Sequence, residues 1–171
     1  MLKLNQPAPD FKGTASQKGQ FKTVSLADYK GKWLVFFFYP RDFTFVCPTE
    51  LKAFAGMEPE FSKANAQILA ASTDSEWSHQ AWFERDLPQV QYPVLADVTH
   101  QISKAYEVLN ENDGSAERGL FIIDPDQNIR YQLVSDGSVG RSASETLRVL
   151  QALQTGALCP ADWKVGEKTL S

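Results

Sequence analysis

The stretch WLVFFFYPRDFTFVCPTE, residues 33–50, runs from an apolar segment through a polar loop to a cysteine. Its first part, Trp33–Tyr39, is continuously apolar, which is typical of a central strand that is covered on both faces. Pro40 ends this strand because proline cannot donate a hydrogen bond to a strand ladder. From Pro48 onward, apolar residues recur at mostly helical spacing. The stretch therefore predicts a strand, a loop and a helix, with Cys47 at the helix start.

The rest of the chain alternates between the two kinds of element. A hairpin is predicted over 11–24, and Pro59 is expected to end or kink the first helix. We expect further strands at 67–72, 94–96, 119–124 and 129–135, and helices at 75–86, 99–109 and 142–155. This order predicts an α/β protein with right-handed crossovers. The specific expectation is a thioredoxin-like fold with an N-terminal hairpin and inserted elements, in which a central mixed sheet is flanked by helices.

Length and composition favour one globular domain over residues 1–171. Of the 171 residues, 43% are hydrophobic, which suffices for a sizeable core. The net charge of −4 argues against a nucleic-acid groove or an anionic membrane surface as the partner. The N-terminus lacks the apolar segment of a secretory signal, and no apolar run is long enough to cross a bilayer. We expect a cytoplasmic protein, whose thiols are normally kept reduced.

Cys47 is the first candidate for chemistry. At a helix start it would lie beside unpaired backbone N–H groups and the positive end of the helix dipole, and both favour the reactive thiolate. Thr44 could donate a hydrogen bond to the sulfur or to a bound oxygen substrate, and Pro40 could shield the pocket from water. The competing interpretation is a small buried hydrophobic cysteine. The combination of these residues at a strand-to-helix junction favours the reactive one.

A thiolate in such a place also needs a cation. The candidates are Arg41, which is near in sequence, and the distant Arg118 and Arg141. Glu50 follows Cys47 by one helical turn, where a second negative charge would disfavour the thiolate. That carboxylate makes sense if it holds an arginine in place, so that the other donors of the guanidinium face the sulfur.

Cys159 lies in GALCPADW, inside the C-terminal segment 156–171. We expect this segment to be exposed or mobile. The two cysteines are 112 residues apart, so they can react only if the fold or a second subunit brings them together. An inert tail cysteine is the alternative.

The quoted stretch resembles a known active-site segment. Pro40, Thr44 and Cys47 meet the pattern P-x-x-x-T-x-x-C, and FYPRDFTFVCPTE is similar to the active site of the typical two-cysteine peroxiredoxins, specifically the peroxidase component of the bacterial alkyl hydroperoxide reductases. STDSEWSHQAW, RGLFIIDPDQNIR, SVGRSASETLRVLQALQ and CPADW resemble later blocks of that group in the same order. The resemblance covers nearly the whole chain from residue 5.

This resemblance implies a thiol-dependent peroxidase that reduces hydrogen peroxide and organic hydroperoxides to water and alcohols. Cys47 would become a sulfenic acid and then form an intersubunit disulfide with Cys159. Thioredoxin or a flavoprotein disulfide reductase would reduce that bond, and no metal or organic cofactor would be needed. The assembly implied is a homodimer, often joined into a ring of five dimers.

The resemblance also implies a role for each residue of the site. Thr44 and Arg118 would position the peroxide and stabilise the charge on its leaving oxygen. Pro40 would shield the sulfenic acid. The implied set of site residues is Cys47, Cys159, Thr44, Arg118, Pro40, Glu50 and Arg141, with the last two orienting the Arg118 guanidinium.

The chain departs from the family pattern in three places. Arg41 stands where a small or apolar residue is commoner, and it would either act on the thiol or face solvent. The GGLG segment of easily over-oxidised members is absent, and the longer C-terminal tail with its YF pair is also missing. We expect faster exchange at Cys159 and resistance of Cys47 to over-oxidation.

Other kinds of site have little support. His79 and His100, the two histidines, lie at no ligand spacing from a cysteine, so a zinc site is not expected. His79 is expected on the surface of its helix. No nucleotide-binding glycine motif occurs. The remaining rival to an enzyme is an oligomer that binds unfolding proteins and uses its thiols as a redox sensor.

Overall fold

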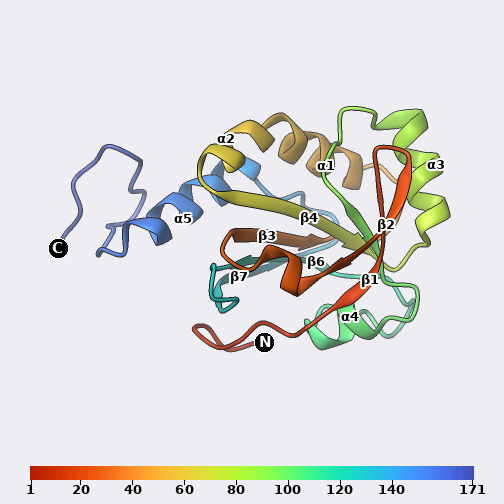
Figure 1. The fold of residues 1–171 in the computed structure, drawn as a ribbon, viewed down its shortest axis with the longest axis horizontal. Helices are drawn as coiled ribbons and strands as arrows, with labels where there is room; N and C mark the ends of the chain where they lie inside the picture. Colours follow the sequence, from red (N-terminus) through yellow and green to blue (C-terminus); the bar gives the residue numbers. More distant parts are fainter.

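The computed structural model describes residues 1–171 and contains one seven-stranded sheet in the order β2-β1-β5-β4-β3-β6-β7 (Figure 1). Strands β3, β4 and β5 run parallel, whereas β6 and β7 and the N-terminal hairpin join them antiparallel. The predicted mixed sheet is therefore confirmed. The strands are β1 Lys12–Gln17, β2 Gln20–Ser25, β3 Trp33–Phe38, β4 Ala66–Ser72, β5 Val94–Ala96, β6 Arg118–Ile123 and β7 Ile129–Ser135.

Six helical segments flank this sheet. They are η1 Leu26–Tyr29, α1 Cys47–Gly56, α2 Glu58–Lys63, α3 Glu76–Asp86, α4 Gln101–Ala105 and α5 Ala143–Thr155, of which η1 is a 3₁₀ helix. None of them is both long and apolar enough to span a lipid bilayer. Helix α1 ends at Gly56 and α2 begins at Glu58, so the helix breaks just before Pro59, as the sequence predicts. In a continuous helix the proline ring would clash with the preceding turn.

The central strand β3 divides the core into two layers. Alternate side chains of a strand point to opposite faces of the sheet. Val35 and Phe37 belong to the core that packs under α1, α2, α3 and α5, while Phe36 and Phe38 belong to the core on the side of η1 and α4. Residues Leu34 to Tyr39 are at most 1% exposed, so the apolar run is covered on both faces as predicted.

Local signals set most helix ends. The Ser75 hydroxyl accepts a hydrogen bond from the Ser78 amide at the start of α3, and Ser142 does the same for Glu145 at the start of α5. Gly156, with φ of 66°, ends α5 in the left-handed region that glycine adopts freely.

The prediction of a helix over 99–109 is too long. The structure has only α4, Gln101–Ala105, in that range. His100 and Glu107 both adopt left-handed backbone conformations, with φ of 62° and 57°, which an α-helix excludes. Apolar spacing alone does not reveal these two residues, because the pattern continues through them.

Candidate active site

Cys47 is the first residue of α1 and is 1% exposed. Cys47 is thus at the helix start, as the sequence predicts, and Pro48 is the second residue of the helix. The amides of Thr49 and Glu50 donate to the Val46 carbonyl at 3.0 and 3.4 Å. These two N–H groups therefore already have an acceptor. The group that contacts the Cys47 sulfur comes from another part of the chain.

That contact is the guanidinium of Arg118, at the start of β6. Its Nη1 lies 3.4 Å from Cys47 Sγ and donates to Glu50 Oε1 at 2.6 Å, while its Nε donates to the Gly137 carbonyl at 2.8 Å. Arg118 is 3% exposed, so little water screens its charge from the sulfur. Strand β6 pairs directly with β3, and this pairing brings residue 118 to the loop that follows β3.

Glu50 binds a second arginine. Its Oε2 accepts from the backbone N and the Nε of Arg141 at 2.8 and 2.6 Å, and Arg141 Nη1 donates to the Gly119 carbonyl at 2.6 Å. The Glu50 and Arg141 side chains are each 1% exposed. Each of these hydrogen bonds restricts the position of the Glu50 carboxylate. The fixed carboxylate in turn orients the Arg118 guanidinium. The structure thus brings together Cys47 and three of its predicted partners.

The buried groups around the sulfur carry a net positive charge. Two guanidinium groups face one carboxylate, so the cluster without the sulfur has a net charge of +1. A buried charge is costly unless an opposite charge pairs with it. A thiolate at Cys47 supplies that charge and makes the cluster neutral, while its Sγ receives a charge-assisted hydrogen bond from Arg118.

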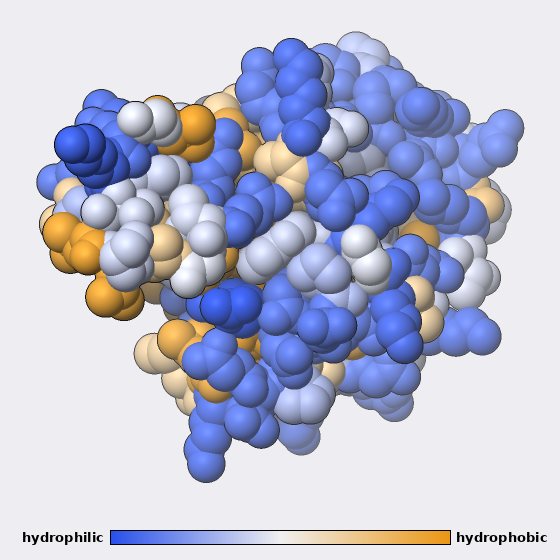
Figure 2. Space-filling view, turned by 60° about the vertical axis from the view of Figure 1, so that its left-hand side comes forward, coloured by the Kyte–Doolittle hydropathy of each residue, from blue (hydrophilic) through white to orange (hydrophobic).

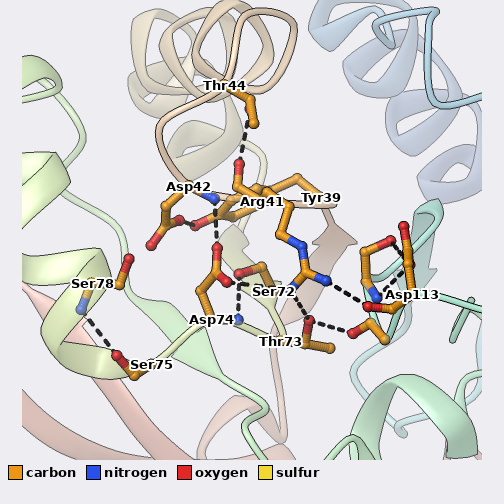
Figure 3. Close-up of polar contacts among 12 residues, drawn as sticks. Tyr39, Arg41, Asp42, Thr44, Ser72, Thr73, Asp74, Ser75, Ser78 and Asp113 are labelled. Carbon is orange, nitrogen blue, oxygen red and sulfur yellow. Dashed lines mark hydrogen bonds and ion pairs between the residues drawn. The ribbon is translucent and has the colours of Figure 1, made fainter.

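Thr44 and Pro40 lie on the same loop, between β3 and α1, and both are half-buried. The Thr44 hydroxyl donates to the Arg41 carbonyl at 2.9 Å (Figure 3). Its hydrogen is thus used within the loop and not given to the sulfur, as the sequence suggests it could be. The oxygen keeps its lone pairs, and it can accept a hydrogen bond from a bound molecule.

Arg41 does not contact the sulfur. Its Nη2 donates to the Asp113 carbonyl at 2.7 Å, and its Nη1 lies 3.4 Å from Thr73 Oγ1 and 3.5 Å from Asp74 Oδ1 (Figure 3). Its side chain is 39% exposed. Of the two expectations for this residue, exposure is partly right, because the guanidinium also connects the active-site loop to two neighbouring loops.

Cys159 lies beyond the end of α5, in the segment that extends away from the sheet in Figure 1. Its Sγ is 3.4 Å from Thr155 Oγ1 and 3.7 Å from the Ala152 carbonyl. It is half-buried at a surface pocket of about 370 Å³ that Arg130 and Arg148 also line. Both cysteines are free thiols, and the fold does not bring Cys159 to Cys47 within one chain.

The surface around this end of the molecule is mixed in character. Figure 2 shows mostly hydrophilic residues on this face, with hydrophobic residues in small groups between them. In the C-terminal segment, Leu158, Val165 and Leu170 are all more than 60% exposed. Trp163 instead is buried, and its carbonyl accepts a hydrogen bond from Arg148 Nη1, which fastens the segment to α5.

The prediction that His79 lies on the surface is wrong. It is 0% exposed, and its Nδ1 lies 2.7 Å from Asp42 Oδ2. Asp42 belongs to the active-site loop, and the motifs of the sequence single out neither residue as part of the site. Helical spacing could have found His79, since Trp82 follows it three positions later on the same buried face of α3.

Backbone strain marks the same loop. Phe43, between Asp42 and Thr44, has φ of 57°, a left-handed conformation that costs a bulky residue on the order of 1–3 kcal/mol. Its ring packs 5.8 Å from that of Trp82, measured between centroids. No group of three or more His, Cys, Asp or Glu side chains is placed to hold a metal ion.

Comparison with known sequences identifies the family of this chain. A profile of the AhpC/TSA family matches residues 4–132. A peroxiredoxin of Caenorhabditis elegans is 52% identical over 98% of this chain and 88% of its own length. A thioredoxin peroxidase of Trypanosoma brucei rhodesiense is also 52% identical, over 98% of this chain and 89% of its own.

Solved structures agree with the sequence relatives. The reduced 2-Cys peroxiredoxin of Plasmodium vivax superposes with a TM-score of 0.93 at 34% identity, over 99% of this chain and 93% of that one. The AhpC of Mycobacterium bovis gives 0.87 at 40% identity, over 96% and 99%. The resemblance and the thioredoxin-like fold expected from the sequence are thereby confirmed. The chain belongs to the AhpC/TSA family and is a peroxiredoxin.

Proposed function

We propose that this peroxiredoxin reduces hydrogen peroxide and small organic hydroperoxides with Cys47 as the attacking group. The thiolate attacks one oxygen of the O–O bond, that bond breaks, and the other oxygen leaves as water or alcohol after taking up a proton. Cys47 becomes a sulfenic acid, so the sulfur is oxidised and the peroxide is reduced. The observation that carries this proposal is the 3.4 Å contact between Arg118 Nη1 and Cys47 Sγ within a buried cluster of net charge +1.

The surrounding groups fit the needs of this step. Negative charge moves from the sulfur to the leaving oxygen, and a guanidinium beside the sulfur stabilises it in both positions. Thr44 Oγ1, with its hydrogen given to the Arg41 carbonyl, is free to accept the O–H of the peroxide. Pro40 adds no N–H to the loop and helps to keep water away. Because Cys47 is 1% exposed, we expect small hydroperoxides to react faster than bulky ones.

Cys159 of a second subunit completes the cycle in this proposal. Its thiol attacks the sulfenic acid of Cys47, a water molecule leaves, and an intersubunit disulfide forms. The distance of Cys159 from the active site within one chain, its half-exposed sulfur and the exposed segment around it support this role. A homodimer is therefore the smallest active unit, and a ring of five dimers is the larger assembly to test for.

The proposed electron donor is a thioredoxin-type dithiol protein, or a flavoprotein disulfide reductase. One relative is named a thioredoxin peroxidase, which supports the first choice. The reaction uses no metal and no organic cofactor, because the sulfur itself carries the oxidising equivalents. We propose a cytoplasmic location, where such a donor keeps the two thiols reduced between turnovers.

Non-reducing electrophoresis together with a peroxide-consumption assay tests this proposal. Peroxide should convert the wild-type chain from monomer to a covalent dimer, and either Cys47→Ser or Cys159→Ser should prevent it. Cys47→Ser should lose consumption entirely, while Cys159→Ser should reduce about one equivalent of peroxide and then stop recycling with thioredoxin. Peroxide turnover that survives Cys47→Ser would refute the proposal, and so would full recycling by Cys159→Ser.

A further inference from the structure

A buried polar group lies beneath the active-site loop and takes no part in the chemistry proposed above. Tyr39 and His79 are 0% exposed, and the Asp42 side chain is 1% exposed. The Tyr39 hydroxyl donates to Asp42 Oδ1 at 2.6 Å, and His79 Nδ1 lies 2.7 Å from Asp42 Oδ2. On its other side, His79 Nε2 lies 3.2 Å from the Leu95 carbonyl oxygen.

These partners determine where the protons are. The Leu95 carbonyl can only accept a hydrogen bond, so Nε2 of His79 carries a hydrogen. Asp42 Oδ1 accepts from the Tyr39 hydroxyl, and one hydrogen bond joins Asp42 Oδ2 to His79 Nδ1. The Tyr39 oxygen also lies 3.3 Å from His79 Nδ1. Asp42 and His79 are thus a buried hydrogen-bonded pair, and removing one side chain would leave a buried polar group of the other without its partner.

The Asp42–His79 pair connects the loop to two regular elements. Asp42 belongs to the loop between β3 and α1, whereas His79 belongs to α3 and its second partner, Leu95, to β5. The Asp42 amide also donates to Asp74 Oδ2 at 2.6 Å, just after β4 (Figure 3). One loop residue is therefore held by side chain and backbone from three directions.

The neighbouring residue explains why such an anchor is needed. Phe43 follows Asp42 directly and adopts the strained left-handed conformation, which bulky residues keep only where the surroundings enforce it. Thr44 comes next, and its hydroxyl depends on the carbonyl of Arg41, on the other side of Asp42. A change in the backbone at 42–43 would thus move the Thr44 hydroxyl relative to Cys47.

We propose that the buried Asp42–His79 hydrogen-bonded pair is a positioning device for the peroxide site. It holds the strained turn at Phe43, and through that turn it places the Thr44 hydroxyl relative to the sulfur of Cys47. A buried hydrogen bond between side chains adds little net stability, but it fixes the direction of the groups that it joins. The inference rests on the proposed function, because it assigns a role within that reaction.

The test compares two reactions of the same sulfur in the full-length reduced protein. Oxidation by hydrogen peroxide requires the Thr44 and Arg118 geometry, whereas alkylation by iodoacetamide requires only the ionised thiol. In Asp42→Asn, which keeps the side-chain shape, the second-order rate constant for peroxide should fall at least about 10-fold. The rate constant for alkylation of Cys47 should stay within about threefold of the wild-type value.

Two further variants separate positioning from stability. Ile129→Ala removes a core side chain of β7 that is 1% exposed. Even where it lowers the stability to urea as much as Asp42→Asn does, it should leave both rate constants within about twofold of the wild-type values. Tyr39→Phe keeps the ring and the Asp42–His79 pair but deletes the hydrogen bond from Tyr39 to Asp42. It should fold even if Asp42→Asn does not, and it should lower the peroxide rate about three- to tenfold with little effect on alkylation.

The outcomes are distinct. Equal falls in the two rates, or a peroxide rate that stays at the wild-type value in the folded variants, would overturn the positioning role. A fast wild-type reaction combined with unchanged variants refutes this inference alone. A wild-type protein whose peroxide reaction is as slow as that of Cys47→Ser would refute the proposed function, and the inference with it.

Discussion

The two cysteines of this peroxiredoxin have opposite surroundings. Cys47 is 1% exposed, begins a helix and contacts Arg118, whose other donors are bound by Glu50 and the Gly137 carbonyl. Cys159 is half-buried, follows a helix end and contacts only Thr155 and a carbonyl of α5. The first thiol is held in a charged cluster in one geometry, while the second is held loosely in an exposed segment. This difference in surroundings supports the two different roles proposed for the thiols, attack on a peroxide and exchange with another sulfur.

The largest expected effect follows from removing the cation beside Cys47. Arg118→Gln should lower the rate constant for oxidation of Cys47 by hydrogen peroxide about 10²–10³-fold, because a preorganised donor to the developing charge is lost. Stopped-flow fluorescence of the reduced protein measures this rate. The matched control is Arg130→Gln, at the pocket that Cys159 lines. This variant should keep the rate constant for Cys47 oxidation within about twofold of the wild-type value. Equal effects at the two arginines would show that overall charge matters and not the contact.

The next effect concerns the carboxylate that joins the two arginines. Glu50→Gln should destabilise the fold by about 3–5 kcal/mol, because it leaves buried guanidinium groups without their counter-charge. Urea unfolding followed by circular dichroism measures this change. Glu145, which pairs with Arg148 at the surface, is the control, and its change to Gln should cost no more than about 1 kcal/mol. If the two variants were equally stable, the buried cluster would not differ from a surface ion pair.

High pH should unfold the core around the first cysteine before it affects the exposed segment. Burial raises the pKa of Tyr92 well above its ordinary value, and the nearby Glu58 and Glu50 carboxylates add to this effect. Burial also raises the pKa of Tyr39, with a smaller contribution from the Asp42 carboxylate. The unfolded chain loses these protons near pH 10, whereas the folded chain keeps them. Each such tyrosine therefore stabilises the fold fully below about pH 10 and lowers the free energy of unfolding by about 1.4 kcal/mol per pH unit above it.

Urea midpoints at pH 9, 10 and 11, with phenolate absorbance recorded in parallel, check this dependence. We expect the midpoint to fall between pH 10 and 11 together with a single rise in phenolate absorbance as the chain unfolds. Phenolate formation in the folded protein near pH 10 would show that the tyrosines are less covered than the structure indicates.

The smallest effect on the chemistry of Cys47 is expected from the other region. Trp163→Ala should loosen the C-terminal segment, since it removes a side chain that is 4% exposed and whose Nε1 donates to the Glu167 carbonyl. Limited proteolysis beyond residue 156 should become faster, while oxidation of Cys47 by peroxide should change less than about twofold. Slower oxidation of Cys47 in this variant would mean that the two regions are not independent.

Much of this arrangement could be predicted from the sequence. The apolar run at β3, the helix start at Cys47 and the break at Pro59 follow from local rules of hydrogen bonding and spacing. The need of a buried thiolate for a held cation points to Arg118, Arg141 and Glu50. The structure places Arg118 against the thiol and joins it to Arg141 through Glu50.

The rest depends on contacts that a linear pattern does not contain. Helical spacing could reveal that His79 is buried, but not its partner Asp42, which lies 37 positions before it in the chain. The contacts of Arg41 with the loops at Asp74 and Asp113 depend on the order of the strands. The shortened α4 depends on two left-handed residues, neither of which is a glycine.

The central claim of the proposed function is that the buried charge cluster, and not cysteine chemistry in general, makes one of the two thiols reactive toward peroxide. The direct measurement is the rate of sulfenic acid formation at each position, with dimedone capture and mass spectrometry, in Cys159→Ser and Cys47→Ser proteins treated with equimolar hydrogen peroxide. We predict rapid labelling of Cys47 and, for Cys159, a rate at least about 10³-fold lower, similar to that of a free thiol. Labelling of both cysteines at similar rates would contradict this role of the cluster.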